Sequence, residues 1–233
     1  MDPTYTSFIV FLIITMFYFS VKPTQTNDNA PVSHTNTAIY FVIVLISQFI
    51  INSYAVTSRC GGSASDNMSS IILSTGAPWT FIFGLLIVCL IMFPGFKSAF
   101  SNVVGYYMVS KSAEEELMKL LPEEMAGDPN NIISKIYGNK SILINKMVPS
   151  NFNDFAKLLK FKAGVDTKPL QNLVAYRDNV GEFCWYMYAA VFVNSVVQYN
   201  IVNISCNKSA DTLEADLAKY KQSSNAPTSS IVV

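Results

Sequence analysis

Four long stretches of this chain contain no Asp, Glu, Lys or Arg, and they surround the apolar runs 8–21, 38–56, 79–96 and 183–205. A helix that crosses a bilayer needs about 20 mostly apolar residues. A charge at the centre of such a helix costs at least about 2.5 kcal/mol on insertion scales, so long uncharged runs are rare outside membranes. The sequence therefore predicts an integral membrane protein.

Composition and net charge support the same interpretation. Hydrophobic residues make up 51% of the chain and charged residues only 14%, whereas a soluble domain carries about 25% charged residues. The 16 basic and 16 acidic residues cancel, so the net charge does not indicate a nucleic-acid partner. The partner that the composition predicts is the lipid bilayer.

We expect an all-α, multi-pass membrane protein with about four transmembrane helices and a small helical soluble module between the third and fourth spans. The first apolar run is the shortest, and it can either span fully or lie shallow and tilted. The predicted organisation is a membrane region at 1–96 with spans at 8–21, 38–56 and 79–96, a juxtamembrane segment and helical module at 97–179, a fourth span at 180–206, and a polar tail at 207–233.

Within the module, helix start and stop signals predict several short helices. One runs from Asp128 to Gly138, and another covers 151–163 with an apolar stripe on one face. Lys168 and Pro169 begin a further helix, which can continue into the fourth span. About eighty residues form only a marginal core, so the module should lean on the membrane, its neighbours or a partner.

The basic residues and two cysteines suggest a topology. Most of the 16 basic residues lie between Lys97 and Arg177, which favours the cytosolic side for the module. Four spans then place both ends of the chain on the opposite side. Cys60 lies just beyond the apolar run 38–56 and Cys206 just beyond the run 183–205, both on that side, so a disulfide between them is a specific hypothesis if that compartment is oxidising. The alternative is two free thiols.

No catalytic or metal-binding pattern is present in the sequence. His34 is the single histidine, and there is no Cys-x-x-Cys pair, phosphate-binding glycine loop or Gly-x-Ser-x-Gly elbow. We therefore expect no enzyme activity, no catalytic residues, no metal site and no cofactor.

Two pairs of amide side chains lie inside the predicted spans. Gln48 and Asn52 are one helical turn apart in the second span, and Asn194 and Gln198 are one turn apart in the fourth. Amides that face lipid are costly, so we expect interhelical polar contacts. The alternative is a polar pathway for a solute, as in a small channel or transporter.

The residues around the third span predict a membrane-interface motif. Proline at Pro78 suits a first helical turn, Trp79 suits the headgroup level, and a break at Pro94 and Gly95 ends the span. Lys97 can then reach lipid phosphates, and the chain can turn and run along the membrane. The full motif comprises Pro78, Trp79, Pro94, Gly95, Lys97, Asn102 and Tyr106.

The 35 residues from Gly76 to Ser110 read GAPWTFIFGLLIVCLIMFPGFKSAFSNVVGYYMVS. The order of the motif residues in this segment resembles the transmembrane minor capsid proteins of large icosahedral DNA viruses, namely the algal chloroviruses and their nucleocytoplasmic relatives. That family often has tryptophan and proline where this chain has Phe96 and Ala99.

The resemblance implies a structural protein that links the internal virion membrane, derived from host endomembrane, to the capsid shell. Its implied partners are other minor capsid proteins and, as a further option, the major capsid protein. A cellular membrane scaffolding factor is an alternative that the sequence leaves open.

Overall fold

The computed structural model describes residues 3–22, 34–122, 139–206, 214 and 217–218. All the regular elements in this part of the chain are helical, as the sequence predicts. The predicted helix from Asp128 to Gly138 and most of the polar tail lie outside the described residues. The elements are α1 (Pro3–Val21), α2 (Thr35–Cys60), α3 (Met68–Ile71), η1 (Ile72–Gly76), η2 (Trp79–Phe83), α4 (Gly84–Met92), η3 (Pro94–Lys97), α5 (Ser98–Phe100), η4 (Ser101–Gly105), α6 (Tyr106–Leu120), α8 (Lys140–Lys146), α9 (Phe152–Leu158) and α10 (Lys168–Val202).

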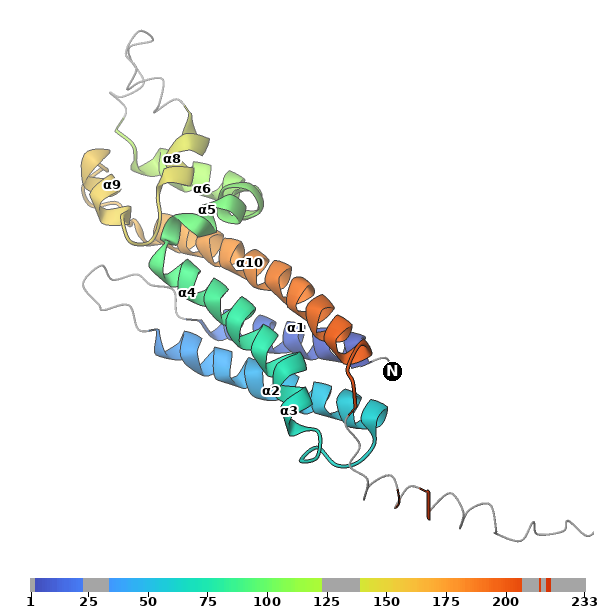
Figure 1. Cartoon of the computed structure of the whole chain (residues 1–233). Helices are drawn as coiled ribbons and strands as arrows, with labels where there is room; N and C mark the ends of the chain where they lie inside the picture. Colours follow the sequence, from blue (N-terminus) through green and yellow to red (C-terminus); the bar gives the residue numbers. More distant parts are fainter. Residues whose placement is uncertain (1–2, 23–33, 123–138, 207–213, 215–216, 219–233) are drawn as a thin grey trace, which may run out of the picture.

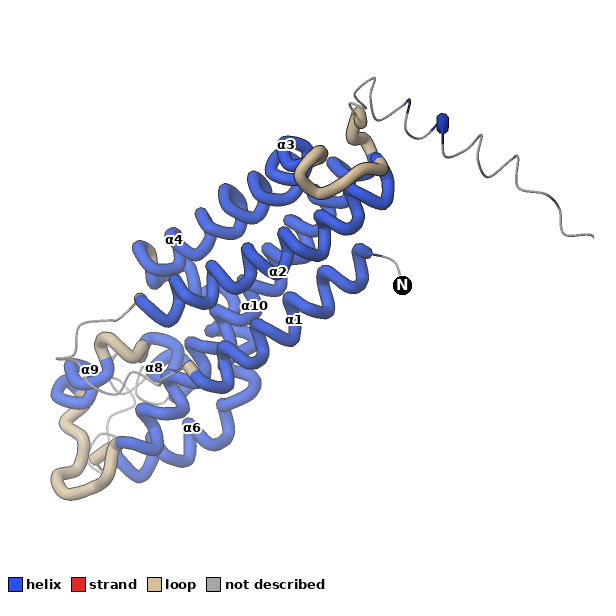
Figure 2. Tube along the Cα trace, turned by 90° about the horizontal axis from the view of Figure 1, so that it is seen from below, coloured by secondary structure: helices blue, strands red, loops and turns tan. Residues whose placement is uncertain are grey.

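Three helical segments are long and apolar enough to cross a membrane: Thr35–Cys60, Met68–Met92 and Lys168–Val202. A shorter apolar helix covers Tyr5–Val21. These segments lie side by side as an elongated bundle, with the N-terminus near the C-terminal end of α10 (Figures 1 and 2). The second, third and fourth expected spans therefore correspond to helices that are long and apolar enough to cross a membrane, and the first, at 8–21, stays a prediction.

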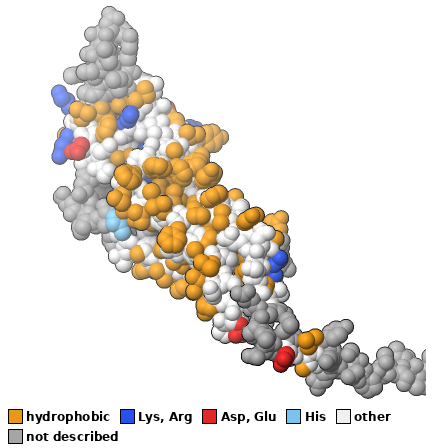
Figure 3. Space-filling view, in the orientation of Figure 1, with side chains coloured by type: hydrophobic (Ala, Val, Ile, Leu, Met, Phe, Trp, Pro, Cys, Tyr) orange, Lys and Arg blue, Asp and Glu red, His pale blue; other side chains and the backbone are white. Residues whose placement is uncertain are grey.

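Aromatic side chains fill the centre of the bundle. The ring of Phe83 lies 5.5 Å from Phe11, 5.4 Å from Tyr186 and 5.4 Å from Trp79, measured between centroids. Large apolar side chains also cover the outer surface, including Ile43, Phe81 and Phe192, and they spread over the bundle in Figure 3. A soluble protein rarely exposes so large an apolar area, so the surface fits a lipid environment.

The third span differs from the prediction at both of its ends. It begins at Met68 rather than at 79, and it ends at Met92 rather than at 96. Pro78 thus lies inside the helix, between the π-helical turns η1 and η2. A wide turn changes the hydrogen-bond register near a residue that has no N–H, so the helix continues through the proline. The sequence analysis placed the start of the span here because a proline suits the first turn of a helix, where its missing N–H needs no partner.

The position of Trp79 is a direct consequence of the earlier start. Its side chain is only 1% exposed and packs between Phe11 and Phe83. The prediction that Trp79 lies at the headgroup level is therefore wrong, because the span already has nearly three turns before it. The predicted break after the span is correct: Phe93 leaves the helical conformation and η3 begins at Pro94.

The module packs α6, α8 and α9 against the first turns of α10. α9 is shorter than the predicted helix over 151–163, because Lys160 adopts a positive φ of 48° soon after Leu158. The buried core of this module comprises Val109, Ala113, Leu117, Leu120, Leu121, Leu143, Ile144, Met147, Phe152, Leu159, Leu170 and Val174.

α10 belongs to both parts of the molecule. It is one helix of 35 residues that starts at Lys168, as predicted, and continues without interruption to Val202. Leu170 and Val174 lie in the module core, whereas Tyr186, Val193 and Val197 lie in the bundle core. Figure 1 shows α10 passing from the module down the length of the bundle.

Candidate functional site

A buried ionic cluster lies where the bundle meets the module. Glu182 on α10 is 4% exposed, and its two carboxylate oxygens each lie 2.7 Å from a lysine ammonium, one from Lys22 and one from Lys97. Lys97 also lies 3.5 Å from the carboxylate of Asp178. The hydroxyl of Tyr186, one turn along α10, donates to Glu182 at 3.1 Å. Three separate segments are thus joined at one carboxylate.

The helix ends bring these groups together. Lys22 is the first residue after α1, and Lys97 is the last residue of η3, which follows the break at Pro94. Burial lowers the pKa of Lys22 more than the nearby Glu182 raises it. Burial also lowers the pKa of Lys97, but the combined attraction of Glu182 and Asp178 outweighs it and raises the pKa overall. Lys97 therefore stays charged, held by two carboxylates.

A cavity of about 250 Å³ adjoins the ionic cluster. The bundle provides one wall and the loop between α8 and α9, including Val148 and Pro149, provides another. The polar and charged lining residues are Tyr18, Lys22, His34, Asn36, Thr37, Lys97, Ser150, Asp178, Asn179, Glu182 and Tyr186. Both signs of charge thus face the same cavity.

Arg177 fastens the module to α10 beside this cluster. Its side chain is fully buried, and its guanidinium donates to the carbonyl oxygens of Ile144 and Met147, the latter at 2.6 Å. These carbonyls belong to the C-terminal end of α8, where a cation is electrostatically favourable. The sequence analysis used Arg177 only as one of the basic residues that favour the cytosolic side for the module.

Two glycines allow η4 to touch the backbone of α10. A Cβ atom added to Gly105 would lie 2.5 Å from the carbonyl oxygen of Arg177, and one added to Gly181 would lie 2.7 Å from the backbone nitrogen of Ser101. Trp185 closes the same contact, because its indole N–H donates to the carbonyl of Phe96 at 2.8 Å. We call this meeting of the bundle and the module, formed by the ionic cluster and by the contact between η4 and α10, the joint. It is tightly packed as well as ionic.

In the structure, the residues of the predicted membrane-interface motif do not form one surface but make separate contacts. Lys97 points to Glu182 and Asp178, so the expectation that it reaches lipid phosphates is wrong. Asn102 buries an amide oxygen that has no partner among the described residues. Tyr106 donates to Glu114 at 2.7 Å and packs against the module core rather than lying along the membrane. The ammonium of Lys97 is held by two carboxylates of α10, and its side chain is only 20% exposed.

The amide side chains within the spans contact one another through Ser7, a residue that the sequence analysis did not identify. The hydroxyl of Ser7 lies within hydrogen-bond distance of the side-chain oxygens of Gln48 and Asn194, the latter at 2.7 Å. Gln48 also donates to the carbonyl of Ser7 at 3.0 Å. This contact links α1, α2 and α10, as expected for interhelical polar residues. Asn52 instead donates to the carbonyl of Gln48 in its own helix, and the amide nitrogen of Gln198 has no partner among the described residues.

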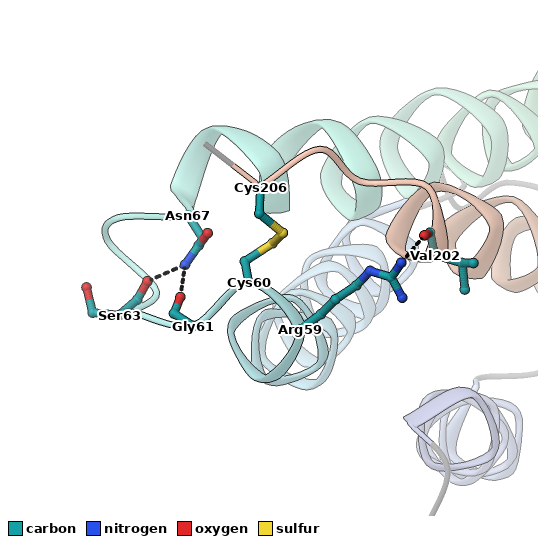
Figure 4. Close-up of a disulfide and its surroundings, with 7 residues drawn as sticks. All are labelled: Arg59, Cys60, Gly61, Ser63, Asn67, Val202 and Cys206. Atoms are coloured by element: carbon teal, nitrogen blue, oxygen red, sulfur yellow. Dashed lines mark hydrogen bonds between the residues drawn. A yellow bond between two sulfur atoms is a disulfide. The ribbon is translucent and has the colours of Figure 1, made fainter. Parts of the chain in front are cut away.

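Cys60 and Cys206 form a disulfide at the opposite end of the bundle, with their Cα atoms 5.3 Å apart (Figure 4). This is the pair that the sequence singled out. Arg59 donates to the carbonyl of Val202 beside it. The amide of Asn67 donates to the carbonyl of Gly61 at 2.8 Å and so orders the loop before α3. The end of α2 is thereby joined covalently to the segment after α10.

Within the described ranges, no group of three or more His, Cys, Asp or Glu side chains is arranged to hold a metal ion. No protein-family model, curated protein or solved structure matches the chain. The physical basis for a function is therefore the geometry of the joint and of the bundle.

Proposed function

We propose that this protein is a four-span structural membrane protein that holds its helical module rigidly at the membrane surface and links the internal membrane of a large DNA virus to the capsid shell. The observation that carries the proposal is the continuity of α10, which contributes to both hydrophobic cores. A helix that belongs to two cores transmits position and load directly from one to the other.

The contacts of α1 support its role as the remaining span. Its 19 residues give a length of about 28 Å, close to the thickness of the hydrocarbon core of about 30 Å. Ser7 contacts Asn194 near one end of α1, and Lys22 contacts Glu182 just past the other. Because α10 runs from Glu182 towards Asn194, α1 lies antiparallel to it across this depth.

The construction of the joint favours an anchor over a flexible tether. Buried ion pairs and backbone contacts at glycines fix the module against the bundle, and a tether would need neither. The resemblance of Gly76–Ser110 to viral minor capsid proteins suggests the shell as the structure held. Exposed apolar side chains of the module, such as Met118 and Leu158, are available for contacts with other minor capsid proteins or the major capsid protein.

Quantitative mass spectrometry of purified particles tests the proposal. We expect the chain to be present in a fixed ratio to shell proteins and to stay with the shell after mild detergent removes lipid. Absence from particles, despite abundance in infected cells, would refute the linker role. A cellular scaffolding factor would give that result while still resisting extraction by alkaline carbonate.

A small channel or transporter is a second candidate, favoured by buried polar atoms in the bundle. The side-chain oxygens of Asn52 and Thr75 and the amide nitrogens of Asn194 and Gln198 have no partner among the described residues. Solute flux in liposomes that is abolished by Asn194→Leu, in protein that still forms its disulfide, would favour this function over the structural one.

A further inference from the structure

An apolar groove of about 570 Å³ runs between α1 and α2 near the joint. Its volume lies in the range of about 300–1,000 Å³ that small-molecule sites usually have. The apolar lining residues are Ile13, Ile14, Phe17, Val21, Ile39, Tyr40 and Ile43. A groove of this composition, open on the face of two membrane helices, suits a hydrocarbon chain.

The groove adjoins the charged cavity at the joint. Tyr18, Lys22 and Asn36 line both of them. The hydroxyl of Tyr18 bonds to that of Thr37 at 2.9 Å, which ties α1 to α2 where the two spaces meet. An apolar groove thus leads directly to a polar compartment.

The boundary between groove and cavity lies at the expected level of the lipid headgroups. α1 ends at Val21 and α2 begins at Thr35, so both apolar helices stop there. A glycerophospholipid has the same order of chemistry along its length, with apolar chains followed by a charged headgroup. The protein and the lipid therefore match in both polarity and depth.

The charges in the cavity indicate the class of headgroup. Two ammonium groups, from Lys22 and Lys97, face two carboxylates, from Asp178 and Glu182. A headgroup with only negative charge would compete with Glu182 for both lysines and would leave Asp178 unmatched. Asp178 has the looser ion contact, at 3.5 Å against 2.7 Å for Glu182, so it is the carboxylate that can accept a further cation.

We propose that the groove and the cavity together bind one glycerophospholipid with a primary-amine headgroup, such as phosphatidylethanolamine. One of its two acyl chains lies between α1 and α2, its phosphate lies near Lys22 and the N-terminal end of α2, and its ammonium faces Asp178. A helix N-terminus adds to the attraction for phosphate. The proposal rests on the bundle lying in a bilayer and does not depend on the link to a capsid.

Native mass spectrometry of the full chain in mild detergent tests the site. The protein is incubated with equal amounts of phosphatidylethanolamine and phosphatidylglycerol that carry the same acyl chains. We expect one retained lipid per chain, with phosphatidylethanolamine preferred about fivefold, the factor that one partly exposed charge contact supplies. In Asp178→Asn we expect this preference to disappear.

Paired tryptophan variants separate the groove from ordinary lipid contact. Ile43 lines the groove, whereas Ile50, seven residues further along α2, does not, and both side chains are exposed. Ile43→Trp should fill the groove and reduce retained lipid at least about fivefold, while Ile50→Trp should leave retention unchanged. Ile39→Trp is a second groove variant if Ile43→Trp fails to form the Cys60–Cys206 disulfide, which serves as the folding control.

Three results would overturn the proposal. Equal retention by the Ile43 and Ile50 variants means surface lipid only. Equal retention of the two lipids by the unsubstituted chain removes the headgroup assignment. Absence of retained lipid would mean that the groove and the cavity do not hold a phospholipid. None of these results bears on whether the protein is found in virus particles, so the two proposals fail separately.

Discussion

Replacing Glu182 with Gln should destabilise the joint, because it removes the carboxylate that Lys22 and Lys97 share. The substitution keeps the size of the side chain, but it leaves the ammonium of Lys22 without its carboxylate, and Lys97 keeps only Asp178 at 3.5 Å. Two unit charges 4 Å apart attract by about 4 kcal/mol at an effective dielectric constant of 20. Much of this attraction is offset by the cost of burying the charges.

The expected net loss follows from the burial of the three groups. Removing one partner of a buried ion pair costs about 3–5 kcal/mol. The lysine side chains keep 18% and 20% of their exposure, so water screens part of the unpaired charge. We therefore expect the lower end, a loss of about 3 kcal/mol in the free energy of unfolding.

Unfolding in mixed detergent and SDS micelles measures this loss. The matched control is Glu116→Gln, which removes an exposed pair with Lys119 in α6, and it should cost less than about 0.5 kcal/mol. Adding Lys22→Met to Glu182→Gln should recover at least about 1 kcal/mol, because the unpaired ammonium is removed. A loss for Glu182→Gln no larger than that of the control would refute the view that the joint depends on these ion pairs.

Other substitutions test the remaining contacts. Cys60→Ser removes the disulfide between cysteines that are 146 residues apart in the sequence, and it should lower the free energy of unfolding by up to about 5 kcal/mol on the chain-entropy estimate. The unfolding midpoint should fall, and reductant should no longer change it. Gly181→Leu should separate η4 from α10 and expose the joint to protease, whereas Gly95→Ala, which meets no atom within 4 Å, should not. Arg177→Met should cost about 2–4 kcal/mol, because two carbonyls of α8 lose charged donors, and the loss should appear as faster amide exchange in α8. Ser7→Ala should weaken interhelical packing by about 0.6–2 kcal/mol, measured in the same SDS titration.

Hydropathy was sufficient to predict the fold class and the approximate location of three spans, because the lipid excludes charge along the whole length of a helix. It was less informative about boundaries. The helix around Pro78 continues through wide π-helical turns, and these depend on packing against neighbouring helices. Trp79 was misplaced for the same reason, since its depth depends on where the helix begins.

The joint could not be predicted, because it depends on which helix ends meet in space. Lys22 and Arg177 have the same appearance in the sequence as ordinary surface residues. Glu182 carried a usable signal: a carboxylate at the mouth of an apolar span, one turn after Asp178, requires cationic partners once it is buried. Ser7 carried a weaker one, as a small polar residue in a run without charges.

The covalent bond between Cys60 and Cys206 has a consequence for biogenesis. One cysteine ends α2 and the other follows α10, so the thiols can meet only after the chain has been synthesised through α10. Formation of this bond therefore reports that the end of α2 and the segment after α10 have come together. Until then both cysteines are thiols that can be oxidised, and afterwards the two segments stay linked until a reductant cleaves the bond.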